Sequence, residues 1–278
     1  MILTEPPIPT AAPAPPWIEL PDDLTANILQ RLGAEETLES AQKVCTTWWR
    51  VCKNPITWRV IDLDYRRCAA SKFDKICLCA VDRSQGQLVE LKLFCYEADD
   101  FLNYVAERSN QLRCLTLTEK DVLGTAYAKA IMKLPQLEEL HFIKMDTVGP
   151  TDFENIGISC PTLKSLTFSN SWNEHLEFTE HAVAIGKTMS NLCHLRLIGQ
   201  RMENKGLEAI LDGCPRLESL ELQRCSGLDL EGELGKRCSD QIKDLRLHFE
   251  DSASMGYLGW IMKQIQPQLT ELKGIIFG

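Results

Sequence analysis

Residues 217–222 read LESLEL, and the pattern L-x-x-L-x-L recurs along the chain. Its occurrences begin at Leu88, Leu112, Leu137, Leu163, Leu192, Leu217 and Ile242, so the successive intervals are 24, 25, 26, 29, 25 and 25 residues. Alternate side chains of a strand point to opposite faces, so the second and third leucines of each hexapeptide share one face. Such a unit, one strand plus one helix, cannot bury its apolar face alone. The pattern therefore predicts an α/β solenoid in which stacked units share a continuous core.

The interval between hexapeptides is typical of leucine-rich repeats, and we expect about seven to eight units over residues 61–278. The strands should run parallel and line the concave side. Helical stretches such as KGLEAILDGCP (residues 205–215) should cover the convex side.

The side chains between the leucines should face the concave surface, because they alternate with the inward positions. The candidate contact residues at these positions are His141, Ile143, Thr167, His194, Arg196, Ile198, Glu221 and Arg246. Their mixture of charges, hydroxyl groups and isolated apolar groups suits recognition of a protein better than a small-molecule pocket, which would be mostly apolar. The alternative is an inert, solvated face.

The composition excludes several classes of function. A net charge of −9 argues against a nucleic-acid-binding surface, which needs clustered Lys and Arg. No apolar run approaches the length of about 18 residues that a membrane span requires. Residues 1–16 hold six prolines and no basic segment, so they are expected to be a disordered tail and not a secretory signal. We therefore expect a cytoplasmic or nuclear protein that binds no membrane.

The cysteines and histidines suggest neither a metal site nor a catalytic centre. The chain has 12 cysteines, but the close pair Cys77-x-Cys79 lacks the spacing of a zinc ribbon. Most thiols should be buried and act as small apolar groups, with Cys95 and Cys114 as possible reactive surface thiols. The five histidines belong to no H-E-x-x-H motif, and the chain has no G-x-S-x-G motif or P-loop. We expect no enzyme activity, no cofactor, no metal and no catalytic residue.

Residues 17–60 have a different periodicity and predict a module of three short helices. In the first helix the apolar residues Leu20, Leu24, Ile28, Leu29 and Leu32 recur at helical spacing, and Gly33 should end it.

The second predicted helix spans residues 34–52 and places Leu38, Ala41, Val44, Cys45 and Trp48 on one stripe. The third opens at Asn54-Pro55, a typical capping pair, and carries Trp58.

The apolar residues of this module resemble the F-box pattern L-P-x-x-[LI], I-L, L, V-C-x-x-W and a closing W. The matching residues are Leu20-Pro21, Leu24, Ile28-Leu29, Leu32, Val44-Cys45, Trp48 and Trp58. One departure is Trp49, which stands where the family usually has Arg or Lys. The stretches at residues 58–63, 80–91 and 206–225 resemble plant F-box and leucine-rich-repeat proteins of the Skp-interacting-partner group.

This resemblance implies the substrate-recognition subunit of an SCF-type E3 ubiquitin ligase. The F-box would bind the Skp adaptor and, through it, a cullin-RING ligase, while the repeats would bind the protein to be ubiquitinated. The residues implied in adaptor binding are Leu20, Pro21, Leu24, Ile28, Leu29, Val44, Cys45, Trp48 and Trp58.

Three alternatives stay open at this point. Leu24, Leu32, Val44 and Trp58 could instead form the core of the module and its contact with the first repeat. The chain could also be a ligase-independent scaffold or inhibitor, although a scaffold has no need for surplus apolar residues at Leu20, Pro21 and Ile28. A small-molecule-sensing receptor ranks last, because such receptors resemble longer arrays.

Overall fold

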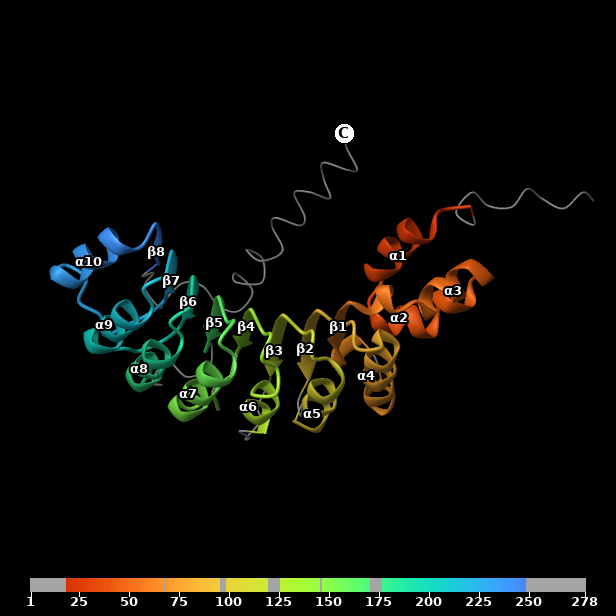
Figure 1. The fold of residues 1–278 in the computed structure, drawn as a ribbon, viewed down its shortest axis with the longest axis horizontal. Coiled ribbons are helices and arrows are strands. Elements are labelled where there is room, and N and C mark those ends of the chain that lie inside the picture. Colours follow the sequence, from red (N-terminus) through yellow and green to blue (C-terminus); the bar gives the residue numbers. More distant parts are fainter. Residues whose placement is uncertain are drawn as a thin grey trace, which may run out of the picture.

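The computed structural model describes residues 19–67, 69–95, 99–119, 126–145, 147–170 and 177–248. In this part of the chain the repeats form an arc, with strands on the concave side and helices on the convex side (Figure 1). The N-terminal helices lie at the end of the arc where the first strand begins (Figure 1). The predicted α/β solenoid with a short N-terminal helical module is confirmed.

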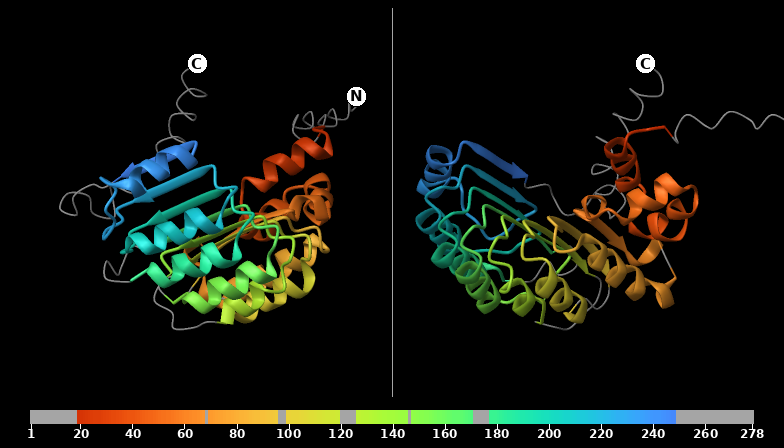
Figure 2. Two further views of the ribbon diagram at one scale, coloured as in Figure 1. Left: turned by 60° about the vertical axis from the view of Figure 1, so that its left-hand side comes forward. Right: turned by 45° about the vertical axis from the view of Figure 1, so that its right-hand side comes forward.

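The described strands form one parallel sheet in sequence order, seen side by side in Figure 2. They are β1 (Val60–Asp64), β2 (Glu90–Cys95), β3 (Cys114–Glu119), β4 (Glu139–Ile143), β5 (Ser165–Ser169), β6 (His194–Ile198), β7 (Ser219–Gln223) and β8 (Asp244–His248). The register places corresponding leucines of the hexapeptides opposite one another, as Leu91 with Leu115 and Leu195 with Leu220. Each repeat thus continues the core of its neighbour, as expected for a solenoid.

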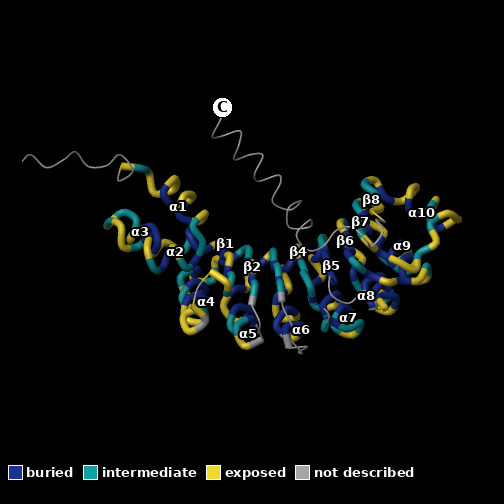
Figure 3. Tube along the Cα trace, turned by 180° about the vertical axis from the view of Figure 1, so that it is seen from behind, coloured by how far each residue is buried: buried dark blue, intermediate teal, exposed yellow. Residues whose placement is uncertain are grey.

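One helix precedes each strand from β2 onward on the convex side. These helices are α4 (Ala70–Ser84), α5 (Asp99–Arg108), α6 (Ala126–Ile131), α7 (Pro150–Ser159), α8 (Thr179–Thr188), α9 (Asn204–Gly213) and α10 (Glu233–Gln241). Their inner faces are buried against the sheet and their outer faces are exposed (Figure 3).

Phenylalanines enlarge the core in the middle repeats. Phe142 on β4 and Phe168 on β5 occupy inward positions where most repeats have leucine. Phe153 on α7 lies edge-on to both, with ring centroids 6.0 Å and 5.3 Å away. Edge-to-face aromatic pairs contribute beyond the area they bury. These rings therefore hold the convex helix firmly against the sheet.

The N-terminal module consists of α1 (Asp22–Gln30), α2 (Ala34–Glu39), α3 (Thr46–Lys53) and two short 3-10 turns, η2 (Ala41–Lys43) and η3 (Pro55–Trp58). The single helix predicted for residues 34–52 is wrong. Cys45 is extended and caps α3, and Ser40, Thr46 and Thr47 around the break have low helix propensity. Gly33 lies in the turn between α1 and α2 with φ of 82°, a conformation that favours glycine. The predicted cap at Asn54 is confirmed, because its side chain accepts a hydrogen bond from the Ile56 amide.

Strand β1 was not among the strands predicted from the hexapeptides, because Trp58 stands in place of the first leucine. Val60 lies opposite Glu90, and counting back two residues on both strands aligns Trp58 with Leu88. Trp58 is only 2% exposed and belongs to the core of the repeats together with Leu38 of α2. Its indole N–H donates a hydrogen bond of 2.8 Å to the Cys52 carbonyl. The last tryptophan of the module therefore also begins the first repeat.

Arg83 near the end of α4 strengthens this junction. Its guanidinium donates hydrogen bonds of 2.9 Å to the Cys52 carbonyl and to the Gln42 side chain. The same group lies 5.7 Å from the ring centroid of Trp58, within the range of a cation–π contact. Lys72 at the start of α4 adds an ion pair of 2.6 Å with Glu39. The module and the first repeat are thus joined by apolar, hydrogen-bond and ionic contacts.

A ladder of charges crosses neighbouring repeats just before the strands. Glu138 pairs with Arg113 of the preceding repeat at 3.2 Å and with Lys164 of the following repeat at 2.8 Å. Farther along, Lys243 pairs with Glu218 at 2.9 Å. Exposed ion pairs of this kind contribute at most about 1 kcal/mol each. Their signs alternate at equivalent positions of adjacent repeats.

The inward and outward positions of β6 predict opposite effects of mutation. Leu195→Ala, at a buried position, should lower the free energy of unfolding by roughly 2 to 5 kcal/mol because it leaves a cavity. His194→Ala, at the exposed neighbouring position, should change it by less than about 0.5 kcal/mol. Urea unfolding followed by circular dichroism measures both, and equal losses would contradict the assigned alternation.

Candidate protein-binding interfaces

The N-terminal module presents apolar side chains on its surface. Leu24 and Ile28 lie one turn apart on α1 and are 51% and 42% exposed, and Val44 before α3 is 55% exposed. Pro21 is exposed and Leu20 is half-buried. We call these five residues the apolar face. Leu24 and Ile28 point outward because α1 turns Ala26 and Leu29 inward, where they fill the small core of the module.

The other predicted adaptor-binding residues have structural contacts within the chain. Leu29 is fully buried in the small core and Trp58 is buried in the core of the repeats, so neither presents a surface. Cys45 and Trp48 are half-buried, and the Cys45 thiol accepts a hydrogen bond of 3.5 Å from the Trp48 amide. Burial of Leu29 follows from its place on α1 opposite Leu24 and Ile28.

At position 49 of α3 the F-box pattern usually has Arg or Lys, but this chain has Trp49 and exposes an indole there. Trp49 is 52% exposed, and the Lys53 ammonium lies 4.9 Å from its ring centroid. The displaced cation, Arg50, pairs with Asp22 at the start of α1 at 2.7 Å. Trp49 therefore adds apolar surface to the module, while Arg50 ties α3 to α1.

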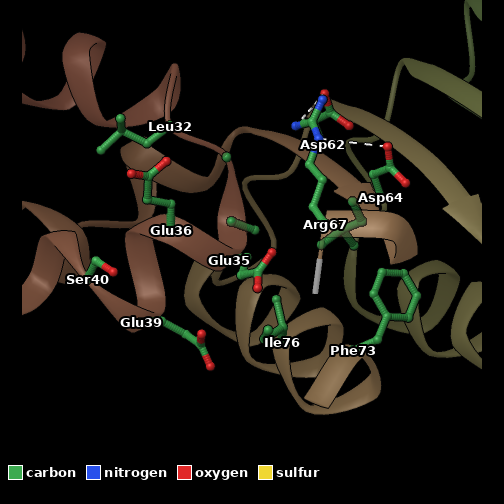
Figure 4. Close-up of a pocket in the computed structure, with 13 residues that line it drawn as sticks. Leu32, Glu35, Glu36, Glu39, Ser40, Asp62, Asp64, Arg67, Phe73 and Ile76 are labelled. Atoms are coloured by element: carbon green, nitrogen blue, oxygen red, sulfur yellow. Dashed lines mark ion pairs between the residues drawn. The ribbon is translucent and has the colours of Figure 1, made fainter. Parts of the chain in front are cut away.

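A pocket that the sequence did not indicate lies between α2, β1 and α4 (Figure 4). Glu35 and Glu39 border it on the α2 side, and Asp62 and Asp64 on the β1 side. Arg67 lies 3.9 Å from the Asp62 carboxylate and 3.7 Å from that of Asp64. Burial, and secondarily the charge of Glu39, raises the pKa of Glu35. The lining comes from both sides of the predicted boundary at residue 60, which is why neither segment alone revealed it.

The predicted concave residues lie on five adjacent strands. They are His141 and Ile143 on β4, Thr167 on β5, His194, Arg196 and Ile198 on β6, Glu221 on β7 and Arg246 on β8. His194 and Arg246 are exposed, whereas Thr167 and Ile198 are buried. Strand alternation predicts the direction of a side chain but not what the rest of the chain covers. Thr167 and Ile198 therefore offer little surface to a partner.

Several of these residues contact one another. The register places Thr167 beside His141, and their Oγ1 and Nδ1 atoms lie 2.9 Å apart. Arg196 and Glu221 pair across β6 and β7, with Nε and Oε1 3.2 Å apart. Arg246 pairs with Asp244 on its own strand at 3.0 Å. The concave face is thus a network of polar groups held by rigid strands.

Two neighbours of this network, Cys114 and Glu139, were absent from the predicted contact residues. They lie opposite each other on β3 and β4, and the Cys114 thiol donates a weak hydrogen bond of 3.9 Å to the Glu139 carboxylate. Glu139 also lies 3.5 Å from Nε2 of His141. Burial lowers the pKa of His141, although Glu139 opposes this shift. Both residues occupy the third position of their hexapeptides, which is the first outward one. The regular spacing of the repeats was therefore the signal that could have placed them opposite each other.

Of the ten cysteines whose side chains the structure describes, most are buried, as predicted: Cys52, Cys77, Cys160, Cys214, Cys225 and Cys238. The side chain of Cys95, one of the two predicted reactive thiols, lies outside the described residues. Burial, reinforced by the charge of Glu139, raises the pKa of the other, Cys114, to about 12. Since the thiolate is the nucleophile, Cys114 should be unreactive at neutral pH.

This shift predicts slow alkylation of Cys114. At pH 8, with EDTA present, iodoacetamide should modify it at least ~100-fold more slowly than a free cysteine, because a raised pKa leaves less thiolate at that pH. Glu139→Gln removes the nearby negative charge and should speed the reaction. Peptide mass spectrometry over time follows both proteins. Rapid labelling of Cys114 in the chain without the Glu139→Gln substitution would contradict the burial and the raised pKa of this thiol.

Known protein families match both the N-terminal module and the repeats of this chain. A family model described as F-box-like matches residues 17–64, and one described as "FBD-associated F-box protein At5g56370, LRR repeats" matches residues 130–231. Among solved structures, internalin C2 from Listeria monocytogenes is 12% identical with a TM-score of 0.42, over 86% of this chain and 98% of that one.

Three of the sequence relatives come from Arabidopsis thaliana. "F-box protein SKIP19" is 41% identical over 85% of this chain and 78% of its own length, and "Putative F-box/LRR-repeat protein 22" is 42% identical over 83% and 76%. "Putative F-box/LRR-repeat protein 23" is 45% identical over 83% of this chain, which spans only 53% of that longer relative. The chain therefore belongs to the plant F-box/leucine-rich-repeat proteins.

Proposed function

We propose that this chain is the substrate-recognition subunit of an SCF-type E3 ubiquitin ligase. Its F-box binds a Skp adaptor, which links it to a cullin-RING ligase, and its concave face binds the protein to be ubiquitinated. The chain itself is a binding subunit and performs no catalysis. The observation that carries this proposal is the apolar face of the F-box.

The apolar face is surplus to the needs of folding. The small core of the module is already filled by other residues, among them Leu29 and Val51, so Leu24, Ile28 and Val44 contribute little to it. Large exposed apolar side chains gathered on one small module mark a protein-binding surface. A ligase-independent scaffold gives no reason for such a surface on a domain of this family.

The junction at Trp58 supports the same role. The F-box and the first repeat share Trp58, and Arg83 bonds to the Cys52 carbonyl of the F-box. This connection limits hinge motion between the adaptor-binding and substrate-binding surfaces. A ligase subunit needs such a fixed relation, because the substrate must be held where ubiquitin is delivered.

The concave face provides the substrate surface. His141, Ile143, Arg196 and Glu221 are half-buried, and His194 and Arg246 are exposed, so all six present atoms to a partner. Side chains fixed by strands and ion pairs lose little entropy on binding. We propose these residues as the substrate contacts.

The cytosol or the nucleus is the proposed compartment. Among the described helices, none has the length and apolar character that crossing a bilayer requires.

The adaptor role predicts a specific loss of binding. Leu24→Ala with Ile28→Ala should weaken binding to a purified Skp adaptor by about 30-fold or more, since losing central interface anchors costs about 2 to 4 kcal/mol. The fold should survive because both side chains are exposed on a helix that accepts alanine. Isothermal titration calorimetry measures the affinity. Ile158→Ala on α7, where the side chain is 66% exposed, is the matched control and should bind normally. Undiminished binding by the double variant would contradict the adaptor role.

The substrate role predicts that binding can be lost separately. Arg196→Glu with Arg246→Glu reverses two charges on the concave face and should remove substrates from the set of captured proteins, while Skp binding persists at the other end of the arc. Arg216→Glu, an exposed residue outside the strands, is the control for a charge reversal elsewhere on the surface. Quantitative proteomics of proteins captured by the three chains is the measurement. Identical sets would exclude this face as the substrate site.

A further inference from the structure

Three side chains of different chemistry converge on the concave face. Cys114 on β3 and Glu139 and His141 on β4 each offer one ligand atom, and these atoms all lie within 4.8 Å of one another. The convergence follows from the sheet, because Cys114 lies opposite Glu139 in the register and His141 is two residues farther along the same face.

The spacing of these atoms is close to that around a tetrahedral metal ion. Oε2 of Glu139 lies 3.5 Å from Nε2 of His141 and 3.9 Å from Sγ of Cys114. Zinc bonds of about 2.0 to 2.3 Å, arranged tetrahedrally, separate neighbouring ligand atoms by roughly 3.3 to 3.8 Å. Because all three ligand atoms lie within 4.8 Å of one another, side-chain rotation must shorten any separation by no more than roughly 1.5 Å.

His141 is oriented for such a role by a neighbour. Its Nδ1 lies 2.9 Å from Oγ1 of Thr167, a residue that is only 9% exposed. Histidines that bind metals usually donate their other ring N–H to a nearby oxygen, which fixes the tautomer and the ring orientation. The contact with Thr167 leaves Nε2 directed at Glu139.

We propose that Cys114, Glu139 and His141 bind a Zn²⁺ ion on the concave face. A thiolate, an imidazole and a carboxylate together suit Zn²⁺, whereas Mg²⁺ and Ca²⁺ take oxygen ligands. On binding, the S–H bond of Cys114 breaks, its proton leaves to solvent and the sulfur bonds to the metal. The three residues leave a fourth position for water or for a ligand from a partner.

This site departs from the expectation that the chain holds no metal. Sequence motifs for zinc sites detect ligands that are close to one another along the chain. Here Cys114 and Glu139 come from successive repeats, and only the register brings them together. The proposal concerns these residues alone and does not depend on the adaptor role.

Cobalt substitution tests the site, because tetrahedral Co²⁺ absorbs visible light strongly and a thiolate ligand adds a near-ultraviolet charge-transfer band. The full chain, stripped with a chelator and kept reduced without added thiols, should bind one equivalent of Co²⁺ with both features. Zn²⁺ should then displace the cobalt and abolish them. Absence of the charge-transfer band would overturn the proposal.

Variants identify the ligands. Cys114→Ser should remove the charge-transfer band, and His141→Gln should weaken Co²⁺ binding at least ~10-fold. Thr167→Val, which keeps the side-chain shape, should weaken binding about 10- to 100-fold if Thr167 orients the imidazole. Cys193→Ser, a half-buried cysteine outside the cluster, is the matched control and should change nothing. Circular dichroism shows whether each variant is folded. A band that survives Cys114→Ser would place the metal on another thiol and overturn the assignment.

Discussion

The burial of Trp58 is the contact on which the rest of the structure depends. A module of three short helices has too little apolar surface for a stable core of its own. By occupying the first apolar position of a repeat, Trp58 connects that small core to the continuous one of the solenoid, and α2 contributes Leu38 to the same core. The indole N–H and the guanidinium of Arg83 both donate to the Cys52 carbonyl, so the junction is also fully hydrogen-bonded at its centre. Because the module is stabilised by the core of the repeats, its apolar face is not needed for folding and stays free for a partner.

The two proposed binding surfaces differ in physical character. The F-box offers large apolar side chains on a small area, which suits an invariant partner bound by shape and burial. The concave face offers charges and hydroxyl groups in mutual contact, such as Arg196 with Glu221. A partner must replace those contacts with its own, so affinity there depends on matching the pattern. Such a surface favours selectivity over strength.

Much of the architecture could be predicted from the sequence, because leucine spacing and strand alternation are local properties. Every hexapeptide forms a strand, and Leu195 and Arg196 point as the alternation requires. The first strand was missed because Trp58 replaces the expected leucine. The break before α3 was missed because the apolar spacing through Val44 continues across it, although Val44 is exposed. Which outward residues are covered depends on how distant segments pack, and periodicity carries no information about that. The contact of Cys114 with Glu139 was predictable in principle, because both residues occupy the same position of successive hexapeptides.

The leucines are nearly the same in every repeat, but the charge of the residue just before each strand changes from one repeat to the next. Repeat arrays change length by losing or duplicating whole units, which the shared core permits. Loss of the unit that carries Glu138 would bring Arg113 beside Lys164, and duplication of that unit would set two glutamates side by side. In contrast, loss of the unit with the uncharged Cys193 would bring Lys164 beside Glu218 as a new attractive pair. The ladder thus determines which changes in the number of repeats would place like charges side by side.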